Sequence, residues 1–123
     1  MEIYEQLEKE KKIKQEVNRI KKLYKEFNKD KAKILEGLIN EAAFMKLTLE
    51  ELRIDISKNG LTELFEQGEQ KFNRERPEVK QYTTFIQRYS QVMKQLIDLL
   101  PPEEKKEEED KLMAFVKKGK NFK

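Results

Sequence analysis

The 123-residue chain contains no cysteine and no histidine. Without cysteine it has no disulfide framework and no thiolate metal site; lacking histidine too, it is excluded from most zinc chemistry and from Ser/His or Cys/His catalysis. No apolar run reaches the roughly 18 residues that a membrane-spanning helix needs, and the N-terminus lacks the apolar core of a signal peptide. These absences predict a soluble intracellular protein with no membrane partner.

What the chain has in abundance is charge, with 41% charged against 37% hydrophobic residues and only four glycines. This composition is typical of helices and coiled coils, so we predict an all-α fold. The charge is unevenly spread: residues 1–33 carry eleven basic and seven acidic side chains, whereas residues 34–70 carry three and eight. We divide the chain into a basic N-terminal helix (1–33), a helical core and oligomerisation region (34–100) and a charged C-terminal tail (101–123).

The most regular stretch, residues 77–100, predicts a long amphipathic helix whose apolar side chains cover an arc of roughly 160°. Pro77 suits its first turn, and Pro101 and Pro102 end it. So wide an apolar face must pack on the rest of the chain, on another copy, or on both. We interpret it as part of an oligomerising helical hairpin, and the alternative is that it fills the core of a monomer. The candidate assembly residues are Tyr82, Phe85, Ile86, Tyr89, Met93 and Leu96.

Residues 2–27 predict a long N-terminal helix with a narrow seam of apolar residues spaced by four and three. The seam consists of Ile13, Val17, Ile20, Tyr24 and Phe27. Basic residues surround it and form a candidate phosphate-binding surface, because lysine and arginine neutralise nucleic-acid phosphates. The alternative is a solvated helix face in which Glu10, Glu16 and Glu26 offset the cations. The candidate DNA-binding residues are Lys11, Lys12, Lys14, Arg19, Lys21, Lys22 and Lys25.

Residues 30–59 predict a short helical pair. The first helix runs from an N-cap at Asp30 to about residue 46. Thr48 and Glu51 match a capping box that would begin the second, and Asn59-Gly60 would end it. A DNA-binding helix-turn-helix is disfavoured, because acidic side chains of the second helix would repel phosphates. The apolar face of the first helix is Ile34, Leu35, Leu38, Ile39, Ala42 and Met45, and that of the second is Leu49, Leu52 and Ile56.

Residues 61–76 are less regular and predict one helical turn followed by a loop. Lys71, Arg74 and Arg76 form a small basic cluster that would contact phosphate or pair with neighbouring glutamates.

In the C-terminal tail a block of acidic residues comes first and basic residues follow. This order suits the dipole of a helix, so we predict a short final helix. Its apolar residues predict a docking peptide for a partner, and the alternative is a loosely packed turn. These residues are Leu112, Met113, Phe115 and Val116.

No enzyme is visible in this sequence. It has no glycine-rich phosphate loop, no metal-ligand spacing and no nucleophile beside a base. We therefore expect neither catalysis nor a cofactor, and we expect a function of binding and assembly.

The order of segments resembles a small terminase subunit of tailed phages and prophages of low-GC Gram-positive bacteria. The similarity runs from about residue 9 to residue 118 and includes NEAAFMKLTLEEL and PEVKQYTTFIQRYSQVMKQLIDLLPPEEKKEEEDKLMAFVKK. It is closest to the group in which a proline precedes a long helix that ends at a Leu-Leu-Pro stop. Here these residues are Pro77 and Leu99-Leu100-Pro101.

The resemblance implies a helper in genome packaging with neither ATPase nor nuclease activity, working in the cytoplasm of the host bacterium. Small terminase subunits form rings of about eight to twelve copies, recognise double-stranded viral DNA and hand it to the large terminase subunit. By this similarity residues 11–33 would face DNA, and Leu112, Met113, Phe115 and Val116 would contact the large subunit. The alternative function is a helical coiled-coil scaffold or protein-interaction module without nucleic-acid binding.

Overall fold

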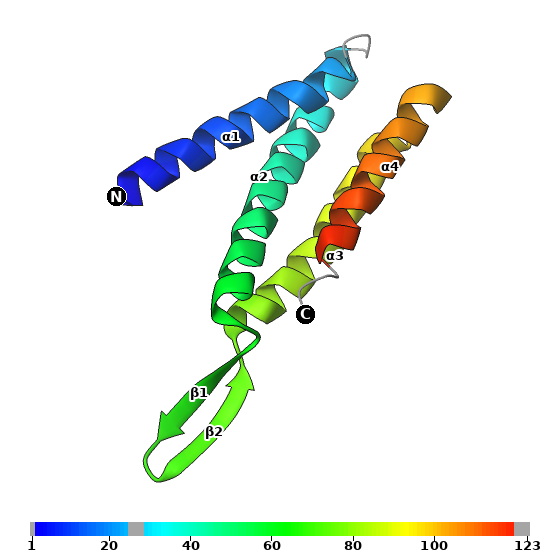
Figure 1. Cartoon of the computed structure of the whole chain (residues 1–123). Coiled ribbons are helices and arrows are strands. Elements are labelled where there is room, and N and C mark those ends of the chain that lie inside the picture. The colour runs from blue at the N-terminus through cyan, green and yellow to red at the C-terminus, as the bar shows by residue number, and fades with distance from the viewer. Residues whose placement is uncertain (1, 25–28, 120–123) are drawn as a thin grey trace.

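A computed structural model describes residues 2–24 and 29–119, and the side chains of residues 5–24 and 33–118. Within these residues the chain is predominantly helical, with four helices and one two-stranded antiparallel sheet. The elements in order are α1 (Glu2–Lys22), α2 (Lys29–Asn59), β1 (Thr62–Gln67), β2 (Gln70–Glu75), α3 (Pro77–Ile97) and α4 (Pro102–Gly119). Helix α1 diverges from α2 toward its N-terminus, and α4 returns along α3 (Figure 1).

Helix α2 is one continuous helix, which corrects the predicted helical pair. Thr48 lies in its interior, where its hydroxyl accepts a hydrogen bond from Lys9 Nζ at 3.1 Å instead of capping a helix. The backbone has no reason to break here, because Leu47 and Leu49 are both buried and continue the helical packing. The predicted end is confirmed: Gly60 has a φ of 85°, and its N–H donates to Ile56 O at 2.7 Å.

Residues 61–76 are the largest departure from the sequence prediction, because a β-hairpin replaces the helical turn and loop. Strands β1 and β2 pair in register from Thr62 with Glu75 to Gln67 with Gln70. The two-residue connection is Gly68-Glu69, in which Gly68 has a φ of 61° and Glu69 does not have a positive φ. Glycine at the first position of such a loop is the signature of a type II′ hairpin turn.

The central helix begins as predicted, with Pro77 in its first turn after an extended Arg76. It ends at Ile97, three residues earlier than predicted, and a turn leads to Pro101 and Pro102. Pro102 opens α4, which is longer than the short final helix that the sequence predicts. The N–H of Lys105 donates to Pro101 O at 2.8 Å and thereby closes the first turn of α4.

One apolar core draws on the N-terminal helix and its following turn, on α2 and on α3, with α4 packed against it. The three regions into which the sequence analysis divides the chain (1–33, 34–100 and 101–123) therefore all contribute described residues to this core. On α2 the predicted face is confirmed at Leu35, Ile39, Ala42 and Met45, whereas Ile34 is 71% exposed. The buried apolar residues are Val17, Ile20, Tyr24, Leu35, Ile39, Ala42, Ala43, Met45, Leu47, Leu49, Ile56, Tyr82, Tyr89, Met93, Leu96, Ile97 and Leu100.

Candidate nucleic-acid and partner interfaces

Helix α1 presents a basic face, which we define as Lys11, Lys14, Lys21 and Lys22. All four side chains are exposed, and helical spacing places them within an arc of about 100°. The apolar seam explains this orientation, because its residues Val17, Ile20 and Tyr24 are buried in the core and leave the lysines on another side of the helix. The basic face therefore lies on the outer surface of α1.

The acidic residues of α1 are not spread evenly over this surface. Between residues 11 and 22 the sole carboxylate is Glu16, and it is only 8% exposed. Glu10 is exposed one position before the basic face, and Glu26 lies outside the described residues. The solvated-face alternative counted Glu16 as an offsetting charge, and its burial removes that charge from the surface.

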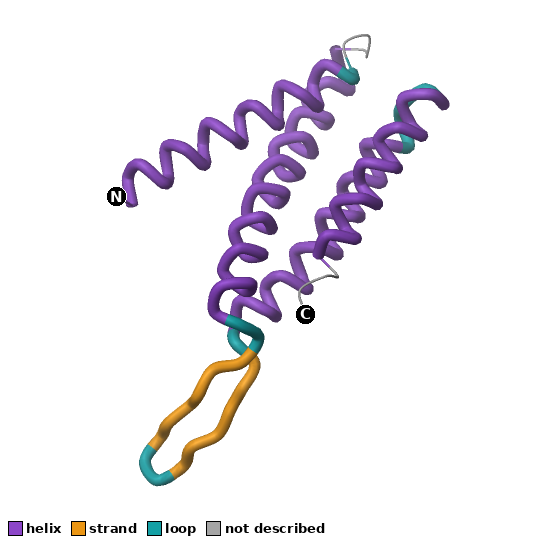
Figure 2. Tube along the Cα trace, viewed as in Figure 1, coloured by secondary structure: helices purple, strands orange, loops and turns teal. Residues whose placement is uncertain are grey.

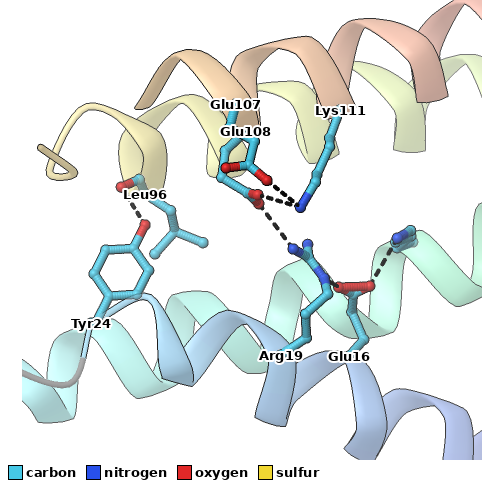
Figure 3. Close-up of polar contacts among 8 residues, drawn as sticks. Glu16, Arg19, Tyr24, Leu96, Glu107, Glu108 and Lys111 are labelled. Carbon is cyan, nitrogen blue, oxygen red and sulfur yellow. Dashed lines mark hydrogen bonds and ion pairs between the residues drawn. The ribbon is translucent and has the colours of Figure 1, made fainter. Parts of the chain in front are cut away.

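Three of the seven predicted DNA-binding residues do not belong to the basic face. Lys12 lines a cleft of about 640 Å³ between α1 and α2, where it shares the lining with Glu5, Glu8 and Glu50 among others. Lys25 lies outside the described residues. The guanidinium of Arg19 points inward to Glu108 of α4, so Arg19 does not contribute to the basic face, and its role as a phosphate contact stays a prediction (Figure 3).

Arg19 belongs to an ionic junction of α1, α2 and α4. Its Nε donates to Glu16 Oε1, and its Nη1 donates to Glu108 Oε1 at 3.0 Å (Figure 3). Lys46 of α2 donates to the other oxygen of Glu16 at 2.8 Å, and Lys111 lies 3.1 Å from Glu108 Oε2. Glu108 is 2% exposed, so this carboxylate is compensated by protein cations instead of water.

The electrostatics of the junction follow from burial and pairing. Burial by itself raises the pKa of Glu16, but hydrogen bonds and charge from Lys46 and Arg19 outweigh it and lower the pKa below its usual value. The pKa of Lys111 is raised, first by its hydrogen bond with Glu108 and then by the charge of that carboxylate. Both shifts favour the charged forms of Glu16 and Lys111, and the ion pairs of the junction join α1, α2 and α4.

Tyr24 ties the turn after α1 to the end of α3. Its hydroxyl donates to Leu96 O, and its ring is buried in the core (Figure 3). Burial, reinforced by the negative charge of Glu108, raises the pKa of Tyr24 to about 12. The phenol is therefore protonated and acts as a donor throughout the physiological range.

The candidate assembly residues on α3 are largely covered by the chain itself. Tyr82, Tyr89, Met93 and Leu96 are buried in the core, and Phe85 and Ile86 are half-buried against it. For the four buried residues the structure favours the alternative that they fill the core of one chain, because α2 and α4 pack over α3. The homo-oligomer itself stays a prediction, and in this fold those four side chains are not available for a contact between copies.

The candidate docking residues lie on an ordered helix that already packs on the core. Leu112 and Phe115 contact the core cluster, Val116 is half-buried, and Met113 is 57% exposed. The ring of Phe115 meets Tyr89 edge-on with centroids 5.3 Å apart. Within this set, Met113 offers the most exposed apolar surface to a partner.

Arg53 of α2 holds the C-terminal part of α4 through contacts with Phe115. Its guanidinium lies 3.9 Å from the centroid of Phe115, its Nη2 donates to Phe115 O, and its Nε donates to Tyr82 Oη at 2.9 Å. Arg53 therefore joins α2, α3 and α4.

Sequence reasoning missed the hairpin. One signal for it was the glycine of Gly68-Glu69, which separates two segments of six residues each. The strands are rich in Glu, Gln, Lys and Asn, which have low strand propensity, so no clear alternation stood out. The basic cluster predicted here pairs with acidic side chains: Lys71 with Glu66 at 3.9 Å, and Arg74 with Glu63 at 2.9 Å. Arg76 contacts Asp55 at 2.7 Å.

Nothing in the described ranges 2–24 and 29–119 has the length and apolar character of a bilayer-crossing helix. Over the same ranges no three or more acidic side chains gather in a way that would hold a metal ion.

Comparisons with family models, with curated proteins and with solved structures find no match to this chain.

Proposed function

We propose that this chain is a small terminase subunit, a non-catalytic protein that binds double-stranded phage DNA and recruits the large ATPase/nuclease subunit during genome packaging. The observation that carries the proposal is the basic face of α1. It gathers four exposed lysines within residues 11–22, and the sole carboxylate of that stretch, Glu16, is turned into the protein. One of the four, Lys21, lies 3.8 Å from Glu36 of α2. A duplex phosphate backbone is the ligand whose charge such a surface matches.

The identity of the DNA and of the partner comes from the similarity of residues 9–118 to small terminase subunits. On that basis the chain works in the host cytoplasm as a ring of about eight to twelve copies. The exposed Met113 and the half-buried Val116 of α4 are the contacts that we assign to the large subunit. Leu112 and Phe115 support that surface from within, because they anchor α4 on the core.

The test is duplex DNA binding measured by fluorescence anisotropy over a range of salt concentrations. Replacing Lys11, Lys14, Lys21 and Lys22 by glutamine removes up to four phosphate contacts. The slope of log affinity against log salt should then flatten by about three to four units. Lys12→Gln should change the slope less, because Lys12 lies among carboxylates in the cleft.

The matched control neutralises four exposed cations elsewhere, namely Lys80, Arg88, Lys94 and Lys106. It changes the net charge equally but leaves α1 intact, so its slope should stay close to that of the wild type. Equal losses in both variants would contradict a specific role for α1. Absence of binding by the wild type at low salt would instead favour the scaffold module without nucleic-acid binding.

A further inference from the structure

The β-hairpin extends beyond the helices and offers two unpaired strand edges. Figure 2 shows it as a separate two-stranded element past the ends of α2 and α3. None of residues 62–75 belongs to the core cluster, and all of these residues except Glu63 and Phe65 are exposed. A two-stranded hairpin without further packing is marginally stable in water, and its open edges invite another strand.

The two strands carry opposite charge. Strand β1 contains Glu63 and Glu66 and no cation, whereas β2 contains Lys71 and Arg74 with one carboxylate, Glu75. Within the hairpin Arg74 pairs with Glu63 and Lys71 with Glu66, so acidic and basic side chains face each other across the ladder. One edge of the hairpin is therefore acidic and the other predominantly basic.

Both faces of the hairpin also expose apolar side chains. Phe65 and Phe72 are cross-strand partners with ring centroids 5.2 Å apart, and Arg74 covers the ring of Phe65 at 4.1 Å. On the other face Leu64 is 60% exposed. A neighbouring strand on either edge would extend these contacts sideways and remove apolar surface from water.

We propose that the hairpin pairs edge to edge with the hairpin of a second copy, with β2 of one copy against β1 of the next. If the copies are arranged around a rotation axis that is parallel to the hairpins, all the hairpins point in the same direction along that axis. The neighbouring β2 and β1 then run antiparallel, which is the pairing that the hairpin itself uses. This contact deepens the proposed function, on which it rests, because it supplies an interface for the homo-oligomer.

Charge selects this pairing over the symmetric ones. Pairing β1 with β1 would set glutamates against glutamates, and pairing β2 with β2 would set Lys71 and Arg74 against their own copies. Like charges directly across a sheet destabilise it, whereas opposite charges stabilise it. The favoured contact therefore joins two different edges, and such heterologous contacts close into rings when the rotation allows. A closed ring leaves no free edge.

The test uses charge reversal on one strand at a time. One variant carries Glu63→Lys and Glu66→Lys, so both of its edges are basic, and the other carries Lys71→Glu and Arg74→Glu, so both are acidic. Each alone should dissociate at protein concentrations about tenfold higher than the wild type does, as measured by mass photometry and sedimentation velocity. An equal mixture should assemble again, because basic edges then meet acidic ones.

The combined four-residue reversal is the matched control. It restores opposite charges within the hairpin and between copies, so it should assemble with itself and not with the wild type. Helical circular dichroism should be the same in all variants, because the hairpin contributes nothing to the core. Replacing residues 62–75 by a short Gly-Ser linker should give a folded monomer.

The proposal is overturned by a wild type that is monomeric at micromolar concentration, by single reversals that assemble normally, or by a mixture that stays dissociated. An oligomer that survives removal of the hairpin also overturns it, and in that case the DNA-binding assay of the basic face still stands. Conversely, a hairpin that pairs as proposed in a chain that binds no DNA refutes the proposed function alone.

Discussion

Single residues decide the charge that α1 shows to solvent. Glu16 and Glu108 are 8% and 2% exposed, and both contact Arg19. Because Glu16, Glu108 and Arg19 pair with one another, Glu16 does not offset the lysines on the outer side of α1. The carboxylates near that side are Glu10, which is exposed on the same helix, and Glu36 of α2, which lies 3.8 Å from Lys21. The same inward contacts fasten α4 to α1, so one arginine both shapes the surface and holds the fold.

The first prediction concerns acid stability at Glu16. Its pKa in the folded chain is lowered from the usual 4.5, so its contribution is fully present above the unfolded value and is lost as pH falls through the folded value. Glu16→Gln should therefore reduce the free energy of unfolding at pH 7 by about 2–3 kcal/mol, since charged hydrogen bonds are lost. It should also flatten the decline below pH 4.5.

Urea denaturation of the wild type and of Glu16→Gln between pH 7 and pH 3 measures the contribution of Glu16 to the free energy of unfolding. Glu10→Gln on the same helix is the control, because that carboxylate is exposed and should change stability little. Equal stabilities of wild type and Glu16→Gln at pH 7 would mean that the junction contributes nothing net.

At the scale of elements, α2 shows that a local sequence pattern can predict a helix boundary where none exists, and the hairpin shows that such a pattern can be missed. Thr48-Leu49-Glu50-Glu51 has the residues of a capping box, yet burial of Leu47 and Leu49 continues the helix through it. At Gly60 the local signal is decisive, because the backbone needs a positive φ there. Helix boundaries therefore follow packing first and capping chemistry second.

The second prediction is that substitutions at Thr48 and Gly60 change the free energy of unfolding by different amounts. Thr48→Ala should change the free energy of unfolding by no more than about 0.5 kcal/mol, because alanine's helix propensity offsets the lost hydrogen bond from Lys9. A true N-cap would lose about 1 kcal/mol. Gly60→Ala should destabilise by about 1–2 kcal/mol, because a left-handed conformation is strained for alanine. Thermal and urea denaturation of both variants provide the comparison.

At the scale of the whole molecule, α4 is the element that completes the core. It lies along α3 and brings Leu112 and Phe115 onto the core cluster, while Glu108 compensates Arg19 (Figure 1). The apolar face of α3 is thus satisfied by α2 on one side and by α4 on the other. That leaves the hairpin as the one described element that contributes no residue to the core cluster.

The third prediction is that a chain ending at Pro101 is less stable and exposes the face of α3. Losing Leu112 and Phe115 should cost about 2–4 kcal/mol and uncover Tyr89 and Met93. Urea denaturation measures the loss, and binding of a hydrophobic dye reports the exposed face.

A chain ending at Lys118 is the control, because it keeps every α4 residue that contacts the core. Its stability should match that of the full chain within about 0.5 kcal/mol. If the two truncated chains were equally stable, α4 would not be part of the folded core.

The sequence by itself determined the helical character, the seam of α1 and the start of α3 at Pro77. These features depend on local periodicity and on the backbone chemistry of proline, which act within a few residues. It also determined the seven candidate cations, four of which form the basic face. Tertiary structure alone decided that α2 runs through Thr48, that Glu16 and Arg19 turn inward and that α4 covers α3. Those outcomes depend on partners up to 89 residues away in the chain, as for Arg19 and Glu108, and no local pattern encodes which charge will be buried.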